Sequence, residues 1–284
     1  MKKHANMKAR RKRQMWHRVR MILAVIFALV FCVSAFFLIK ERRETNKEKS
    51  AFESLQALVS EEPTSTQTTA TVPTDMTETS SSEEETIVTE PAETTMIPKY
   101  APVYEQNPDF FGWISIDGMN INYPVMHTPE DPQFYLRRAF DKSDSHCGVP
   151  FLDAKCAPDS NAYIVYGHHM KDGTMFGHLT DYAEKDFYLS HQTIHFDTLY
   201  EHRKYQVFAV FYCDVSYEDN GSFAFYKYTN LSDETVYDEF ISQLRQVTIY
   251  ETDFEVENGT DILMLSTCSY HTSNGRFVVV AKRV

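Results

Sequence analysis

A cysteine and an arginine lie eight residues apart near the C-terminus, at facing ends of two apolar runs. The segment LMLSTCSYHTSNGRFVVV spans residues 263–280, so Cys268 ends the first run and Arg276 begins the second. If the two runs pair as a hairpin, the Arg276 guanidinium lies close to the Cys268 thiol. A cation there favours the nucleophilic thiolate and can bind an oxyanion or a substrate carbonyl. Each residue also has a structural interpretation, as a buried apolar thiol and as a solvated hairpin charge.

Two adjacent histidines could supply the base that such a thiol needs. In YGHHMKDGTMFGHL, a β-branched run ends at Gly167, and His168 and His169 follow where the chain leaves the sheet. Strand-end loops commonly carry active-site groups. Neighbouring residues of extended chain point to opposite faces, so only one histidine can face the thiol, and the pattern leaves open which one. Together with His178 they could bind a metal, but the spacing matches no zinc motif, and we expect no metal and no cofactor.

The elements that would position these residues are mostly short strands. NPDFFGWISIDGMNINYPVM (107–126) alternates like a hairpin around Asp117-Gly118. A helix is predicted over 232–246, with Ser232 as its N-cap and apolar residues on one face. Further strands are expected at 148–156, 161–169, two within 191–215, and the two runs around Cys268 and Arg276. Many strands, few helices and no βαβ alternation favour a mainly β fold, a closed or nearly closed barrel.

The N-terminal third predicts a membrane anchor and a spacer. Residues 21–39 (MILAVIFALVFCVSAFFLI) carry no charge and would reach about 28 Å as a helix, enough to cross a bilayer. Nine Lys/Arg precede this run and five lie in the ten residues after it, which predicts a cytoplasmic N-terminus. Residues 59–98 are rich in Thr, Ser, Glu and Pro, so we expect disorder there. The predicted organisation is a basic tail (1–20), a transmembrane helix (21–39), an extracellular linker (40–98) and a catalytic domain (99–284).

A cleaved signal peptide is the alternative to the anchor, but the apolar run is long and its end is a poor cleavage site. Residues 99–284 carry 27 acidic side chains against 14 Lys/Arg, which argues against a nucleic-acid partner. Four of the five cysteines lie outside the apolar run. Cys147 and Cys156 could form a disulfide or remain separate thiols, and the spacing does not decide.

Together these segments resemble a class B sortase. The resemblance covers about residues 100–284 and includes His, Cys and Arg in that order. It rests on five segments: NPDFFGWISIDGMNINYPV, FYLRRAFDKSDSHCGVPFLD, YGHHMKDGTMFGHL, LSTCSY and GRFVVVAKRV. It implies a barrel of about eight strands, with the helix at 232–246 in the insertion between strands 6 and 7. One departure is His169, at a position that is often Asn in the family.

The resemblance also implies an activity and its residues. His168 matches the catalytic histidine, beside Cys268 and Arg276, and the candidate substrate-binding residues are Leu136, Ser266 and Thr267. The expected enzyme is a cysteine transpeptidase of a Gram-positive surface. It would cleave a C-terminal sorting signal after Thr through a thioester, then transfer the protein to an amine. That amine would belong to a peptidoglycan precursor or to a pilin or other surface protein, and the sequence leaves both the amine and the sorting motif open.

Other cysteine enzymes fit less well. Papain-like and amidase folds place Cys before His, whereas the only histidine after Cys268 is His271. L,D-transpeptidases read roughly SHGC followed by Arg, which LSTCSYHTSNGR does not match. The non-enzymatic alternative is an anchored adhesin or binding module on a stalk, in which Cys268 would be inert.

Overall fold

The computed structural model describes residues 2–60, 95–216, 221–250 and 255–284. These form two compact units, residues 1–53 and 54–284, and the second contains the whole β-sheet. The predicted spacer falls mostly on residues 61–94, outside the described residues. The expectation of disorder there stays a prediction.

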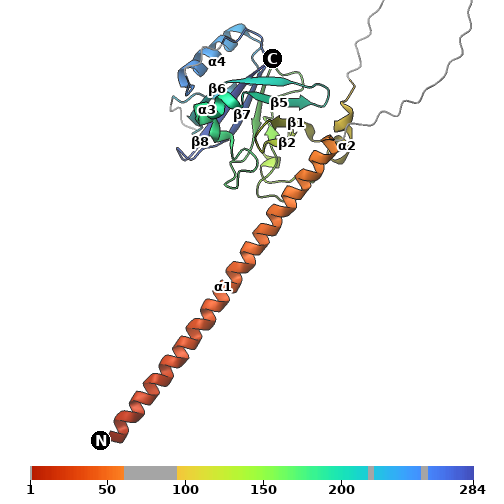
Figure 1. Ribbon diagram of the computed structural model, residues 1–284. Helices are drawn as coiled ribbons and strands as arrows, with labels where there is room; N and C mark the ends of the chain where they lie inside the picture. Colours follow the sequence, from red (N-terminus) through yellow and green to blue (C-terminus); the bar gives the residue numbers. More distant parts are fainter. Residues whose placement is uncertain (1, 61–94, 217–220, 251–254) are drawn as a thin grey trace, which may run out of the picture. The chain divides into compact units, whose positions relative to one another are not determined.

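The sheet closes into a barrel of eight strands, which confirms the predicted fold class (Figure 1). Around the barrel the order is β1-β2-β3-β4-β7-β8-β6-β5, and β5 pairs with β1 to close it. Most neighbours are antiparallel, but β2 and β3, and β4 and β7, run parallel. The strands are β1 (Phe110–Ile116), β2 (Asn122–Met126), β3 (Phe151–Leu152), β4 (Ala162–Tyr166), β5 (Thr193–Thr198), β6 (Lys204–Asp214), β7 (Ile262–Cys268) and β8 (Gly275–Arg283).

Aromatic side chains fill the barrel and reveal which residues face inward. The rings of Phe111, Tyr163 and Phe196 come from β1, β4 and β5 and contact one another, with centroids 5.6 to 6.2 Å apart. Since β4 does not pair with β1 or β5, Tyr163 must point across the interior. Alternation then places Ala162, Ile164 and Tyr166 on the outer face of β4.

Helices are few and short apart from the first. They are α1 (Lys2–Ser60), α2 (Ala101–Gln106), α3 (Lys185–Ser190) and α4 (Glu234–Val247), with short 3₁₀ turns η1 (Pro98–Tyr100), η2 (Phe134–Leu136), η3 (Leu179–Ala183) and η4 (Phe225–Lys227). As predicted, α4 lies between β6 and β7. Its N-cap is Asp233 rather than the predicted Ser232. The Asp233 carboxylate accepts from the backbone N–H groups of Thr235 and Val236, and a carboxylate also suits the positive end of the helix.

The apolar face of α4 packs on the outer face of the barrel. Phe240, Ile241 and Leu244 are buried in one cluster with outward residues of β4, β7, β8 and β6. That cluster includes Met264 and Val278. Figure 1 shows α4 next to β6. The helix therefore forms a wall on the outside of the barrel.

Helix α1 extends further than the predicted membrane span. Residues 40–60, which the sequence predicts to be linker, continue the helix to Ser60. Their sequence supports this, because the pairs Lys40–Glu44 and Lys49–Glu53 lie one turn apart, at 3.7 and 4.0 Å. The helix is long and apolar enough to cross a membrane. Its last residues belong to the barrel unit, where the Gln56 side-chain amide donates to the Asn122 carbonyl at 2.7 Å.

The five cysteines are all free thiols. The possible Cys147–Cys156 disulfide is therefore absent, and both residues are buried. Cys213 on β6 is buried as well, and burial raises the pKa of Cys156 and of Cys213 to about 12. In the barrel unit only Cys268 is partly exposed.

Candidate active site

Cys268 and Arg276 lie opposite each other on the outer face of the barrel. The β7–β8 hairpin pairs Cys268 with Arg276, and two residues earlier Ser266 pairs with Val278. In an antiparallel pair, residues directly opposite point to the same face. Ser266 also pairs with the outward Tyr166 on β4, so Cys268 and Arg276 both face outward. The hairpin predicted from the sequence is confirmed.

His168 follows β4 at the same end of the barrel. The parallel register aligns Tyr166 with Ser266. It continues past the strand end, because the Gly167 N–H donates to the Ser266 carbonyl at 3.1 Å. The Thr267 hydroxyl donates to the Gly167 carbonyl at 2.8 Å. Two residues beyond Tyr166 is His168, and two residues beyond Ser266 is Cys268. The ends of β4, β7 and β8 therefore bring a histidine, a cysteine and an arginine to the same end of the barrel.

Gly167 allows the tight packing that this strand end requires. A Cβ at this position would lie 2.6 Å from the ring of Phe176, which is fully buried. The Phe176 N–H also donates to the His168 carbonyl at 3.0 Å. The chain after β4 thus folds back on itself and fixes the backbone of His168.

A backbone carbonyl orients the His168 ring. Nε2 lies 2.9 Å from the Leu136 carbonyl oxygen. A carbonyl only accepts, so Nε2 carries the proton and Nδ1 is left to exchange one. His168 is half-buried, and this burial lowers the pKa of its ring. The hydrogen bond to Leu136 acts in the opposite direction, whereas the electrostatic effects of Arg137 and His146 lower the pKa further. The ring is thus held largely neutral near pH 7.

The Arg276 guanidinium is half-buried and held by its own hairpin. Its Nη1 donates to the Gly275 carbonyl at 3.0 Å. An arginine has five N–H donors, so this contact leaves further donors for a carbonyl or an oxyanion. The planar fork suits such directed bonds better than a lysine ammonium would.

The three predicted substrate-binding residues all lie beside this row, in different environments. The main-chain carbonyl of Leu136 is hydrogen-bonded to the His168 ring. Ser266 is 1% exposed on the Cys268 face, and within the described ranges its hydroxyl has no hydrogen-bond partner. Thr267 points inward, and its hydroxyl is engaged by Gly167. Their roles toward substrate stay predictions, but the Thr267 contact positions the His168 backbone.

The neighbouring histidine has other surroundings. The His169 ring packs edge-on against Tyr270, with centroids 5.5 Å apart. Its Nδ1 is buried and has no hydrogen-bond partner in the part of the chain that the structure describes. His169 thus links the loop after β4 to the loop after β7.

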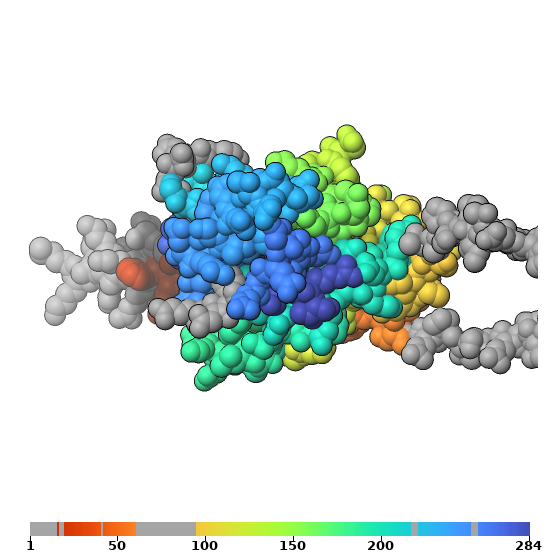
Figure 2. Space-filling model, turned by 90° about the horizontal axis from the view of Figure 1, so that it is seen from above, coloured from red at the N-terminus to blue at the C-terminus, as the bar shows by residue number. Residues whose placement is uncertain are grey.

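The insertion between β6 and β7 borders the same face. The Leu231 N–H donates to the Asn161 side chain at 2.9 Å, just before β4 begins. In Figure 2 the blue residues of α4 accordingly lie beside the green residues that precede β4. Together with the outward cluster on β7 and β8, this makes the insertion one wall of the Cys268 face.

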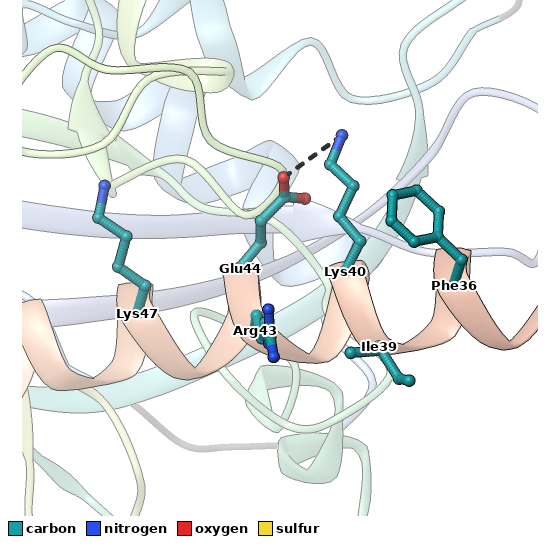
Figure 3. Close-up of a pocket in the computed structure, with 6 residues that line it drawn as sticks. All are labelled: Phe36, Ile39, Lys40, Arg43, Glu44 and Lys47. Atoms are coloured by element: carbon teal, nitrogen blue, oxygen red, sulfur yellow. Dashed lines mark ion pairs between the residues drawn. The ribbon is translucent and has the colours of Figure 1, made fainter.

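A hollow along α1 has a different character. It is lined by Phe36, Ile39, Lys40, Arg43, Glu44 and Lys47. Figure 3 shows that all six come from one helix, with the Lys40–Glu44 ion pair among them. None of Cys268, His168 and Arg276 lines it, so it is separate from the candidate active site. Among the described residues no group of three His, Cys, Asp or Glu could hold a metal ion.

Comparison with known proteins decides the family. A family model described as the sortase domain matches residues 114–284. The chain belongs to the sortase family. Sortases of class B are cysteine transpeptidases, and this chain is an enzyme of that type.

The similar proteins are sortases B. The chain is 31% identical to sortase B of Staphylococcus aureus over 65% of this chain and 74% of that one. It is 30% identical to sortase B of Listeria monocytogenes over 63% and 71%. A solved Staphylococcus aureus sortase B–substrate complex superposes with a TM-score of 0.67 at 26% identity, over 85% of this chain and 98% of that one.

The sequence analysis did not identify two residues that lie near His168 and are candidates for a functional role. Arg137 and His146 act electrostatically on His168, yet they lie 31 and 22 residues before it in the chain. The segment FYLRRAFDKSDSHCGVPFLD contains both, but no local pattern in it indicates contact with the base.

Proposed function

We propose that Cys268, His168 and Arg276 carry out a transpeptidation that joins surface proteins to an amine of the cell wall or of another surface protein. The supporting observation is the direct pairing of Cys268 with Arg276, together with the parallel register that ends β4 two residues before His168 and beside β7. The exposure of the thiols supports the same role, since Cys268 is partly accessible while Cys147, Cys156 and Cys213 are buried. An inert structural cysteine would have the opposite environment.

The first half-reaction makes a thioester. The Cys268 sulfur, having lost its proton to His168, attacks the carbonyl carbon of a Thr in the sorting signal. The carbonyl electrons move to oxygen, and Arg276 stabilises the resulting oxyanion. As the oxyanion collapses, the peptide C–N bond breaks and the departing amine takes the proton from His168.

The second half-reaction transfers the acyl group. An acceptor amine attacks the thioester carbon while His168 removes its proton. The C–S bond then breaks, and the Cys268 thiolate that leaves takes this proton back from His168. The exchanging proton occupies Nδ1 of His168, because Nε2–H stays on the Leu136 carbonyl. Burial favours this role, since an imidazole kept neutral at rest is ready to accept a proton.

The apolar part of α1 would anchor this enzyme. Its composition supports a single membrane span, and the basic residues before residue 21 favour a cytoplasmic N-terminus. The barrel would then lie outside the cell, where sorting signals and peptidoglycan amines are found.

Trapping the thioester tests this function. Detergent-solubilised full chain would be incubated with a peptide library that holds Thr at the cleaved position, and the protein would be mapped by mass spectrometry. We expect an acyl adduct on Cys268 that hydroxylamine removes. Iodoacetamide should block it by modifying Cys268 while the three buried thiols of the barrel unit stay unlabelled. An unreactive Cys268 would instead support an anchored binding module.

A further inference from the structure

The loop between β2 and β3 is built to hold a carbonyl against His168. The Val149 N–H donates to the Tyr135 carbonyl at 3.1 Å. Gly148 has φ +61°, and a Cβ there would lie 2.7 Å from the Leu136 oxygen. Only glycine allows so close an approach. Leu136 is thereby fixed, and so is the residue that follows it.

That following residue is Arg137, and the loop holds its guanidinium in place. Nη1 of Arg137 donates to the His146 carbonyl at 2.7 Å. The Ser145 N–H returns a bond to the Arg137 carbonyl at 3.1 Å. Both Arg137 and His146 are exposed to solvent. The guanidinium is thus held by one main-chain bond at an exposed position, and its other N–H donors remain for a ligand.

Arg137 differs from the other cations of this loop in its partners. Arg138 forms an ion pair with Asp144, and Lys142 forms one with Asp109 at 2.8 Å. Within the described ranges Arg137 has no carboxylate in ion-pair distance. In a domain with 27 acidic side chains and 14 Lys/Arg, an uncompensated cation beside the base is unusual.

The proposed reaction indicates which group of the substrate would lie near Arg137. The base that protonates the departing amine also deprotonates the incoming one, so both amines occupy the same position beside His168. A group attached close to that amine therefore extends over the rim of the site. Arg137 lies on this rim, since the carbonyl that orients His168 belongs to the preceding residue.

We propose that Arg137, braced by His146, binds an anionic group, a carboxylate or a phosphate, of the amine that resolves the thioester. The planar guanidinium matches both anions in a bidentate manner. The site would thus select acceptors that carry a negative charge near the reacting amine. This inference rests on the proposed transpeptidase function.

The test compares acceptors with and without an anionic group near the amine. Full chain in detergent, loaded as the thioester, would receive glycylglycine or glycylglycine amide, and phosphoethanolamine or ethanolamine. The measured quantity is the ratio of kcat/KM for the charged and neutral member of each pair. A ratio within one variant is independent of how much thioester forms and of changes in the basicity of His168. Preference within the first pair indicates a carboxylate ligand, and within the second a phosphate.

We expect a preference of about tenfold for at least one charged acceptor, the scale of one charge-assisted interaction. Arg137→Gln should bring that ratio to about one, and Arg137→Lys should keep part of it. The matched control is Arg138→Gln, whose parent side chain is already paired with Asp144; its ratio should equal that of the wild type.

Two results overturn the inference by itself: no preference in the wild type, or an undiminished preference in Arg137→Gln, with the thioester forming in either case. If no peptide acylates Cys268, the proposed function fails first and this inference fails with it. The two failures are therefore distinguishable.

Discussion

Cys268 on β7 and Arg276 on β8 are directly paired across an antiparallel hairpin, with both side chains on the outer face of the barrel. Adjacent strands are about 4.8 Å apart, so the guanidinium can reach whatever the thiol attacks. The pairing leaves two roles open for the arginine. It can act as a charge on the thiol or as a directed donor to the substrate.

Arg276→Lys separates these two roles, because lysine keeps the charge but lacks the planar fork. We expect turnover to fall at least ~100-fold, the scale of losing one oxyanion donor. The pH dependence of Cys268 alkylation should change little, and the melting temperature should hold. Near-normal turnover in Arg276→Lys would mean that charge alone suffices. Intact activity in Arg276→Ala as well would make the pairing incidental.

Substitutions of the two adjacent histidines should have unequal effects. His168→Ala should abolish turnover, since it removes the base aligned with Cys268. His169→Ala should retain much of it, because that ring packs against Tyr270. Peptide cleavage and thioester formation would be measured for both variants. An inactive His169→Ala variant together with an active His168→Ala variant would show that the base is His169 and not His168.

His168 should titrate at lower pH than a free histidine. Burial and the charges of Arg137 and His146 lower its pKa, so the unfolded chain, with a value of about 6.5, takes up this proton first. The stability tied to His168 is therefore present above the unfolded value and is lost as the pH falls through the folded one. Unfolding in urea at neutral and acidic pH should show a smaller loss in His168→Gln than in the wild type. Ring NMR of His168 gives the direct check, and a pKa at or above 6.5 would contradict this prediction.

The Thr267 hydroxyl should matter for positioning. Thr267→Val keeps the shape but removes the bond to the Gly167 carbonyl, leaving that carbonyl unsatisfied at a cost of about 1–3 kcal/mol. We expect lower stability and lower kcat. Thr267→Ser, the matched control, keeps the hydroxyl and should recover most of the loss. A Thr267→Val variant with unchanged stability and a raised KM would instead favour direct substrate binding.

Topology can be tested on cells. We expect the chain to fractionate with membranes, and protease added to protoplasts should digest the barrel. A reporter fused to the N-terminus should remain protected inside. If the barrel instead survives protease treatment of sealed protoplasts, it does not lie outside the cell and the proposed orientation is wrong.

The sequence by itself determined those features that depend on neighbours in the chain. The β7–β8 hairpin was predictable because a short loop leaves two apolar runs little choice but to pair, and that pairing sets Arg276 against Cys268. Helix α4 was predictable from its 3.6-residue period, although its cap fell on Asp233. The length of α1 was not predicted, because the charged residues 40–60 resemble a linker while the spacing of their charges suits a helix.

Tertiary structure decided what depends on distant parts of the chain. The parallel pairing of β4 with β7 joins residues 100 positions apart, and only closure of the barrel sets that register. The Leu136 carbonyl reaches His168 from 32 positions away and brings Arg137 with it. No local periodicity encodes such contacts, because they arise from how the loops pack once the strands have closed. The pairing of Cys268 with Arg276 was therefore predictable from the sequence, whereas the orientation of His168 and the position of Arg137 beside it required the folded barrel.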